Sequence, residues 1–262
     1  MNENSMMYWY PRIKDLGIPT PDTILIPVQL DFDEICILVD GGKSDKVTKI
    51  YGQVKQAANK IGFPIFLRGS ESANKHDWVR SCFVQNENQI SSAMQNLAEF
   101  SAMVDISFDC LAVRKFLDLD FKFKAFNGMP VAAERRYFVK NKKVQCWHPY
   151  WPETSIKNPT SKDWLAELRE LQTPGEGEVE LLTWDAELIG ETLGGYWSVD
   201  FCRHKNGTWY VTDMALGEQS YHWTTCRHAP AVQKAQYPNP LVDGNEPPEE
   251  EDYFDDNDFM IE

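Results

Sequence analysis

The sequence has no long hydrophobic run and no segment that resembles an export signal. No stretch approaches the ~18 consecutive apolar residues that a membrane-spanning helix needs. The first residues, MNENSMMYWYPR, lack the basic region followed by an apolar stretch that marks a signal peptide. A cytoplasmic protein with no membrane partner is therefore expected.

The six cysteines are dispersed, and none belongs to a CxxC pair. Scattered cysteines in a chain without a signal peptide indicate reduced thiols rather than disulfides. Cys226 and His228 could contribute to a zinc site, but no ligand spacing matches a known one. This neighbouring pair is therefore interpreted as incidental.

Basic residues are scarce, with 26 Lys and Arg against 40 Asp and Glu and a formal net charge of −14. This balance argues against broad nucleic-acid binding, which needs clustered Lys and Arg. Residues 243–262 are dense in acids and contain no basic residue, so they supply most of the imbalance. We interpret this tail mainly as a solubilising appendage. Its interleaved aromatic residues leave open a role in docking.

The most informative stretch is YWSVDFCRHKNGTWYVTDMALGEQSYHW, from Tyr196 to Trp223. Two alternating runs, 197–202 and 208–213, flank an Asn-Gly pair, which is typical of a β-hairpin. Each run carries one carboxylate, Asp200 or Asp213, and Glu218 follows. Clustered carboxylates repel one another unless a cation or a base lies among them, and hard oxygen ligands suit Mg²⁺. A solvated hairpin with polar faces is the alternative.

The other segments give a mixed α+β pattern with much antiparallel pairing. Residues 1–22 are interpreted as a proline-punctuated opening with an exposed YWY, residues 23–39 as strand and loop, and residues 70–77 as a flexible loop. Apolar spacing predicts helices over 46–61, 90–103, 164–171 and 185–193. Strands are expected over 63–68 and 110–117, and a second hairpin is expected from 131–139 and 143–147.

Four pieces follow one another in a recognisable order. They are FPIFLRGSESANKHDW (residues 63–78), VRKFL (113–117), ERRYFV (134–139) and the two-carboxylate hairpin. This order resembles the ATP-grasp superfamily, and within it the eukaryotic cell-division-cycle branch that assists assembly of translation initiation factor 2. The ending DMALGEQSYHW is also similar to that of bacterial and phage ATP-grasp proteins of unassigned substrate. The resemblance covers roughly residues 60–220.

The resemblance implies two α+β lobes that sandwich ATP. Residues 1–50 would be a reduced preceding domain, and residues 51–115 would form lobe A with a phosphate-binding loop. Residues 116–224 would form lobe B with the metal site, and residues 225–262 would be the acidic tail.

The resemblance also implies roles for particular residues. The nucleotide-binding set would be Arg68, Ser72, Lys75, Arg114, Lys115, Phe116, Leu117 and Glu134. In the connector at residues 114–117 the backbone would meet the adenine, and the side chains of Arg114 and Lys115 are interpreted as surface charge. Arg136 and Lys75 would act on the transferred phosphoryl group, and Glu134 would hold the Arg136 guanidinium. Asp200 and Asp213 would hold Mg²⁺. Ala215 replaces the usual asparagine, so one metal ligand is missing or supplied elsewhere, with Glu218 as the nearest candidate and His222 as a weaker one.

Two classes of function fit this resemblance. The first is an ADP-forming ligase that joins a small-molecule or peptide carboxylate to an amine or thiol through an acyl phosphate. The second is an ATP-binding assembly factor in which nucleotide orders the lobes and a protein partner docks outside. A kinase-like phosphotransferase shares the ATP chemistry and stays open.

Overall fold

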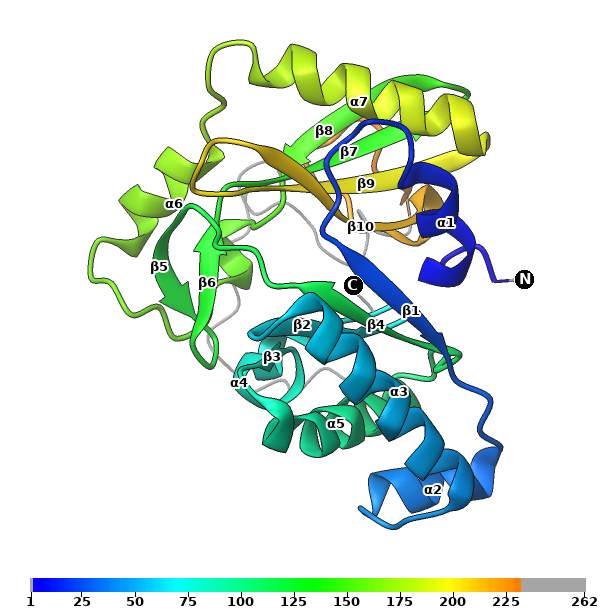
Figure 1. Ribbon diagram of the computed structural model, residues 1–262. Helices are drawn as coiled ribbons and strands as arrows, with labels where there is room; N and C mark the ends of the chain where they lie inside the picture. The colour runs from blue at the N-terminus through cyan, green and yellow to red at the C-terminus, as the bar shows by residue number, and fades with distance from the viewer. Residues whose placement is uncertain (1, 232–262) are drawn as a thin grey trace.

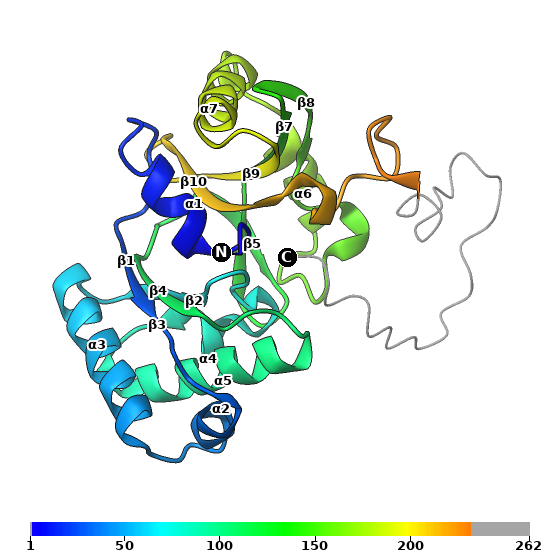
Figure 2. The same ribbon diagram turned by 90° about the vertical axis from the view of Figure 1, so that its right-hand side faces the viewer.

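The computed structural model describes residues 2–231, which form two lobes, each built on a four-stranded antiparallel sheet (Figure 1). Most of the acidic tail predicted for residues 225–262, from residue 232 onward, lies outside the described residues. Figure 2 shows the two sheets facing each other, with α7 on the outer side of one sheet and α3 and α5 on the outer side of the other. Any group held between the sheets therefore meets residues of both lobes.

Lobe A contains β1 (Thr23–Pro27), β2 (Ile65–Gly69), β3 (Phe83–Val84) and β4 (Cys110–Lys115), in the order β1-β4-β2-β3. Its helices are α2 (Phe32–Val39), α3 (Asp45–Ile61), α4 (Trp78–Ser81) and α5 (Ile90–Met103). The apolar faces of α3 and α5 pack on this sheet and form a separate core. Ser44 begins α3 by accepting a hydrogen bond from the Val47 amide at 3.1 Å, as an N-cap residue does.

Lobe B contains β7 (Glu134–Lys140), β8 (Lys143–Pro149), β9 (Tyr196–Arg203) and β10 (Trp209–Leu216), in the order β10-β9-β7-β8. Helices α6 (Trp164–Gln172) and α7 (Glu178–Leu193) precede β9. Gly190 allows α7 to approach β7, because a Cβ at this position would lie only 2.4 Å from a methyl carbon of Val139. The hairpin of β5 (Phe121–Ala125) and β6 (Met129–Ala132) joins the lobes.

The N-terminal residues differ from the sequence-based interpretation. Met6–Ile13 form helix α1, in which Trp9 and Tyr10 are buried and Tyr8 stacks on Trp197 of lobe B. The YWY segment is therefore largely a core element rather than an exposed one, because its aromatic rings fill the space between α1 and both lobes.

Residues 23–50 belong to lobe A and not to a separate preceding segment. Strand β1 pairs with β4, placing Thr23 opposite Arg114. The following residues, expected to be strand and loop, form helix α2, which is begun by a capping box between Asp31 and Glu34. The helical predictions for α3 and α5 are confirmed, whereas α7 begins seven residues before its predicted start at Asp185. The β5–β6 hairpin was not predicted.

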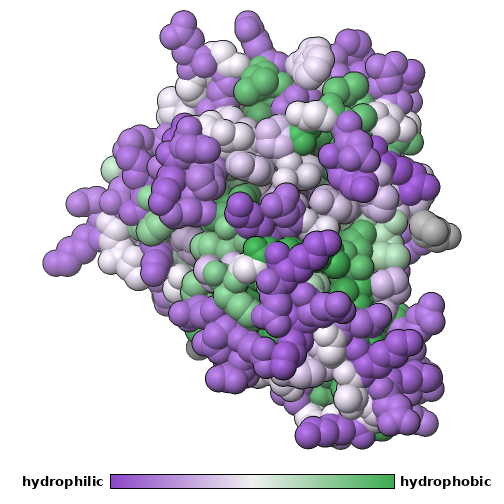
Figure 3. All heavy atoms as spheres, in the orientation of Figure 1, coloured by the Kyte–Doolittle hydropathy of each residue, from purple (hydrophilic) through white to green (hydrophobic). Residues whose placement is uncertain are grey.

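Hydrophobic side chains gather at mid-height on the face shown in Figure 3, where the two lobes meet, and hydrophilic residues surround them. Among residues 2–231, none of the helices is both long and apolar enough to cross a membrane.

Candidate nucleotide site

A cavity lies between the lobes and encloses about 650 Å³, open solvent at its mouth included. The residues that line it come from β2, η1 (Lys75–Asp77), α4, β4 and the connector after it, β6, β7, β9 and β10, together with Pro21 before β1. Eight of the predicted site residues line it: Arg68, Lys75, Arg114, Lys115, Phe116, Leu117, Glu134 and Asp213.

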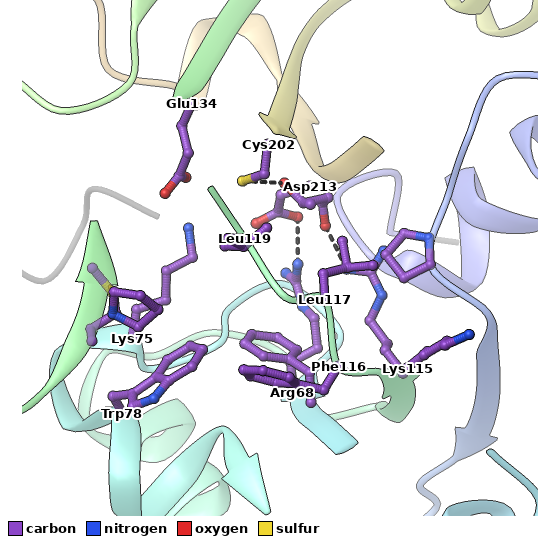
Figure 4. A pocket seen from close by; sticks show the side chains of 16 residues that line it. Arg68, Lys75, Trp78, Lys115, Phe116, Leu117, Leu119, Glu134, Cys202 and Asp213 are labelled. Carbon is purple, nitrogen blue, oxygen red and sulfur yellow. Dashed lines mark hydrogen bonds and ion pairs between the residues drawn. The ribbon is translucent and has the colours of Figure 1, made fainter. Parts of the chain in front are cut away.

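One end of the cavity is apolar and aromatic (Figure 4). The ring centroid of Trp78 lies 5.7 Å from that of Phe66 and 6.1 Å from that of Phe116. Leu117, with Leu119 and Met129, extends this apolar lining. Flat rings and branched aliphatic groups of this kind accommodate the faces of a planar heterocycle.

Strand β4 ends with Arg114 and Lys115, whose side chains were interpreted from the sequence as surface charge. This interpretation is wrong for Arg114, which is 3% exposed. Its guanidinium donates to Thr23 Oγ1 at 3.1 Å and to the Thr212 carbonyl at 2.5 Å. Burial lowers the pKa of Arg114 to about 10. Arg114 thus joins β1, β4 and β10 behind the cavity, whereas the Lys115 side chain is exposed.

The other end of the cavity carries opposed charges. Asp200 on β9 and Asp213 on β10 are directly opposite in register, and Arg136 on β7 is opposite Asp200. Residues directly opposite in an antiparallel pair share one face of the sheet. The two carboxylates and Arg136 therefore form a cross-strand row on the face of the lobe B sheet that is turned toward lobe A.

Each of these carboxylates has an arginine partner. Arg136 donates two hydrogen bonds to Asp200, from Nε at 2.8 Å and from Nη2 at 2.9 Å. Arg68, which reaches across from lobe A and is 1% exposed, places Nη1 2.7 Å from an oxygen of Asp213. Burial lowers the pKa of Arg136, but the charge and hydrogen bonds of Asp200 outweigh burial and raise it. The guanidinium is therefore charged.

Neighbouring arginines on β7 point to opposite faces, as strand geometry requires. Arg135 is turned toward α7, where its Nε lies 2.7 Å from Glu178 and its Nη1 donates to the Leu171 carbonyl at 2.9 Å. Of the two arginines, Arg136 is thus the one on the face toward lobe A.

Glu134 does not hold Arg136, contrary to expectation, because Asp200 takes that place. The Glu134 carboxylate instead accepts a hydrogen bond from Trp151 Nε1 at 2.9 Å. Burial raises the pKa of Glu134, and the nearby charge of Lys75 opposes this rise. The Lys75 ammonium points toward Glu134 in Figure 4 and also contacts the Tyr150 hydroxyl at 3.2 Å. Lys75 and Glu134 thus bring a cation and a carboxylate to the same wall of the cavity.

The loop after β2 is more closely packed than the sequence suggested. Ser70 and Ser72 are buried, and the Ser72 carbonyl accepts a hydrogen bond from the Gly69 amide at 3.0 Å. Ser72 does not line the cavity, whereas Lys75, at the start of η1, does. The packed loop places Lys75 at the cavity without presenting Ser72 to it.

Glu218 lies apart from the cavity. It is exposed on η4 (Gly217–Gln219) and does not line the cavity. Asp200 and Arg136 are also outside the lining set, but they adjoin Asp213 in the cross-strand row. Ala215, at the usual asparagine position, is opposite Ser198, so the row carries two carboxylates and no third ligand there.

Comparison with solved structures establishes the fold. C-terminally truncated Cdc123 from Schizosaccharomyces pombe matches 82% of this chain and 86% of its own, with a TM-score of 0.53 and 14% identity. The chain has the α+β ATP-grasp fold. No protein-family profile matches this chain, and no curated protein matches it by sequence.

Two further solved structures are similar to this chain. An ATP-grasp RimK domain protein from Sphaerobacter thermophilus has 16% identity and a TM-score of 0.43, covering 81% of this chain and 58% of its own. D-alanine–D-alanine ligase from Bacillus anthracis, complexed with ATP, has 14% identity and a TM-score of 0.45, covering 82% and 53%. This chain therefore spans little more than half the length of these two proteins.

Several residues at the cavity were not assigned a role from the sequence. Trp78 lies within the quoted motif, but its aromatic contacts with β2 and the connector are visible only once the strands are paired. Thr212 occupies the irregularity in register between Val211 and Asp213, where β10 departs from regular pairing. The alternating pattern alone does not reveal such a bulge.

Proposed function

We propose that this protein binds Mg-ATP between its lobes and acts as an ADP-forming ligase that joins a carboxylate to an amine or thiol. The observation that carries the proposal is the polarity of the cavity. An aromatic end leads to Asp213, which lies opposite Asp200, and each of these two carboxylates is paired with an arginine. ATP is arranged in the same way, because its adenine has flat faces that suit an aromatic surface and its phosphate chain is charged.

The aromatic end suits the adenine. Trp78 and Phe116 present ring surfaces, and the backbone of the connector borders them. One donor in this wall is unsatisfied: Arg114 Nη2 is buried and has no hydrogen-bond partner among residues 2–231. A buried donor of this kind costs free energy unless an acceptor reaches it, so a polar ligand in this cavity would be stabilised.

The charged end suits the phosphates and their cation. Arg68, Lys75 and Arg136 are the cations at or beside this end. Asp200 and Asp213 provide the hard oxygen ligands that Mg²⁺ prefers, and they would hold it. Mg²⁺ bound there would neutralise charge that develops on the phosphates during transfer. Each arginine could exchange its carboxylate partner for a phosphate group, because carboxylates and phosphates both accept bidentate hydrogen bonds from a guanidinium.

The reaction has two steps. A substrate carboxylate oxygen attacks the γ-phosphorus of ATP, the bond to the β-phosphate oxygen breaks, and ADP leaves with the electron pair. The amine or thiol then attacks the acyl carbon and loses a proton, and the bond from this carbon to the phosphate oxygen breaks, so that phosphate leaves with the electron pair. Arg136 and Lys75 would stabilise the transferred group, because fixed cations aimed at developing charge lower the barrier.

The assembly-factor function is the second candidate. The similarity to Cdc123, which extends over 86% of that chain, favours it. In this case Mg-ATP would bind in the same cavity and order the two lobes. A protein partner would then dock on the outer surface, without ligation.

Measurement of ADP release distinguishes the two candidates. The ligase account predicts that ADP forms from Mg-ATP only when a suitable carboxylate and an amine or thiol are both present, and that Arg136→Gln abolishes this. The assembly account predicts tight Mg-ATP binding, no acceptor-dependent ADP and nucleotide-stabilised capture of a partner. Acceptor-dependent ADP release that persists in Arg136→Gln would contradict the role given to this residue.

A further inference from the structure

A second cluster of ligand-type side chains lies beside the proposed nucleotide site. Cys146 and His148 on β8 meet His222 and Cys226 from the segment after η4, and one ligand atom of each lies within 4.8 Å of all the others. Two thiols and two imidazoles are the donor set of a common structural zinc site. His222, the weaker candidate for the missing magnesium ligand, belongs to this cluster, whereas Asp200, Asp213 and Glu218 do not.

The spacing of the four residues follows from local structure. Cys146 and His148 are two residues apart on one strand, so both point to the same face. His222 and Cys226 are four residues apart, and the Cys226 amide donates to the Trp223 carbonyl at 2.8 Å in a turn that brings them together. Two short ligand pairs on separate segments are a usual construction for a four-ligand metal site.

The measured separation agrees with tetrahedral coordination. Cys146 Sγ lies 3.7 Å from His222 Nδ1. Bonds of about 2.3 Å to sulfur and about 2.05 Å to nitrogen, at the tetrahedral angle, separate the two ligand atoms by about 3.6 Å. A zinc ion would therefore fit between these atoms with little movement.

The surroundings of the cluster support the ligand orientation. His222 is fully buried, and its Nε2 lies 2.9 Å from the Tyr196 hydroxyl, so Nδ1 is the nitrogen directed at the cluster. The backbone amide of His228 donates to Cys226 Sγ at 3.4 Å. Outer contacts of both kinds orient and stabilise ligands in metal sites.

One atom of the cluster lacks a protein partner. Nε2 of His148 is buried and has no hydrogen-bond partner among the described residues. A buried ring nitrogen without a protein partner is available to a metal ion.

From this geometry we infer that Cys146, His148, His222 and Cys226 bind one zinc ion in a closed, structural site. Four protein ligands leave no open position for substrate, unlike a catalytic zinc site. Of the pair considered in the sequence, Cys226 belongs to the proposed site and His228 does not. The side chain of His228 instead accepts a hydrogen bond from Arg227.

The position of the site indicates what the zinc does. The chain leaves β10 at one edge of the lobe B sheet, and the ligands His222 and Cys226 bring it to β8 at the other edge. His222 stacks on Phe138 of β7, with ring centroids 3.5 Å apart, and His148 is opposite Arg136 in register. Zinc would fasten this returning segment over the sheet, next to the row that contains Arg136 and Asp200.

The test is the metal content and spectrum of the full chain, purified without a histidine tag. We expect about one zinc per chain, a fall in the thermal midpoint on chelation, and new reactivity of two thiols. Cobalt in place of zinc should give the intense visible bands of a tetrahedral site and a sulfur-to-cobalt charge-transfer band. Cys226→Ser and His148→Asn should lose stoichiometric metal, and the exposed control Cys36→Ser should retain it.

Two results would overturn the inference. One is a wild-type chain that binds neither zinc nor cobalt stoichiometrically, or that binds cobalt without the sulfur band. The other is unchanged metal content in both Cys226→Ser and His148→Asn. If these variants do not fold, the wild-type cobalt spectrum decides, because it needs no substitution. None of these readouts depends on ATP, so the inference stands or fails apart from the proposed function.

Discussion

Replacing Arg135 with glutamine is expected to lower the free energy of unfolding by about 3–5 kcal/mol, because Glu178 would then be a buried carboxylate without a cation. Arg135 and Glu178 are 1% and 6% exposed, and their side chains meet at 2.7 Å. The guanidinium also donates to the carbonyls of Leu171 and Thr173, which end α6. Urea denaturation of the wild type and the variant measures the loss.

The neighbouring residue supplies the matched comparison. Arg136→Gln leaves Asp200 without its cation and should also destabilise the chain. Only this variant should lose phosphoryl transfer, by about 10²–10³-fold, because only Arg136 lies on the cleft face. Equal losses of turnover in the folded fractions of Arg135→Gln and Arg136→Gln would contradict this account, because they would show that the face on which an arginine lies does not determine its effect on turnover.

The second large effect concerns Arg68 and Asp213. The sequence alone suggests that neutralising Asp213 relieves repulsion among acids, but the structure reverses this sign because Arg68 pairs with it across the lobes. Asp213→Asn should therefore destabilise the chain by about 3 kcal/mol or more, since Arg68 is buried. Thermal unfolding with and without Mg-ATP measures both the stability and the response to nucleotide.

A double-mutant cycle separates the ion pair from the nucleotide site. Arg68→Met with Asp213→Asn should cost less stability than the two single variants added together, because residues in contact are coupled. The double variant should still fail to respond to Mg-ATP. Asp163→Asn, an exposed aspartate whose side chain makes no capping hydrogen bond, is the control. If the stability lost by the double variant equals the sum of the two single losses, Arg68 and Asp213 do not stabilise each other.

Local patterns in the sequence identified much of the fold. The bounds of α5 match the prediction at both ends, and the Asn206-Gly207 turn joins β9 to β10 as expected. These elements are encoded by apolar periodicity and by a turn that needs a positive φ, which Gly207 supplies. Both signals involve residues close together in the sequence, so they can be recognised without knowledge of the tertiary structure.

Other features depend on contacts between distant residues. The sequence alone suggests that Arg114 is a surface charge, but β1 and β10 cover it in the structure. It also suggests that the aromatic residues of α1 are exposed, but most of them are buried against the two lobes. The four proposed zinc ligands are unremarkable as a sequence, because the β8 pair and the pair after β10 are far apart in the chain. Pairing of β7 with β8 and the return of the last described segment bring them together.

The most direct test of the central claim is calorimetric titration of the full chain with a non-hydrolysable ATP analogue and Mg²⁺. We expect saturable binding at one site that needs Mg²⁺ for full affinity. A parallel thermal-unfolding scan should show stabilisation by ~2.7 kcal/mol at about 100 times the dissociation constant. The absence of both binding heat and a thermal shift at millimolar nucleotide with Mg²⁺ would contradict nucleotide binding in the cavity.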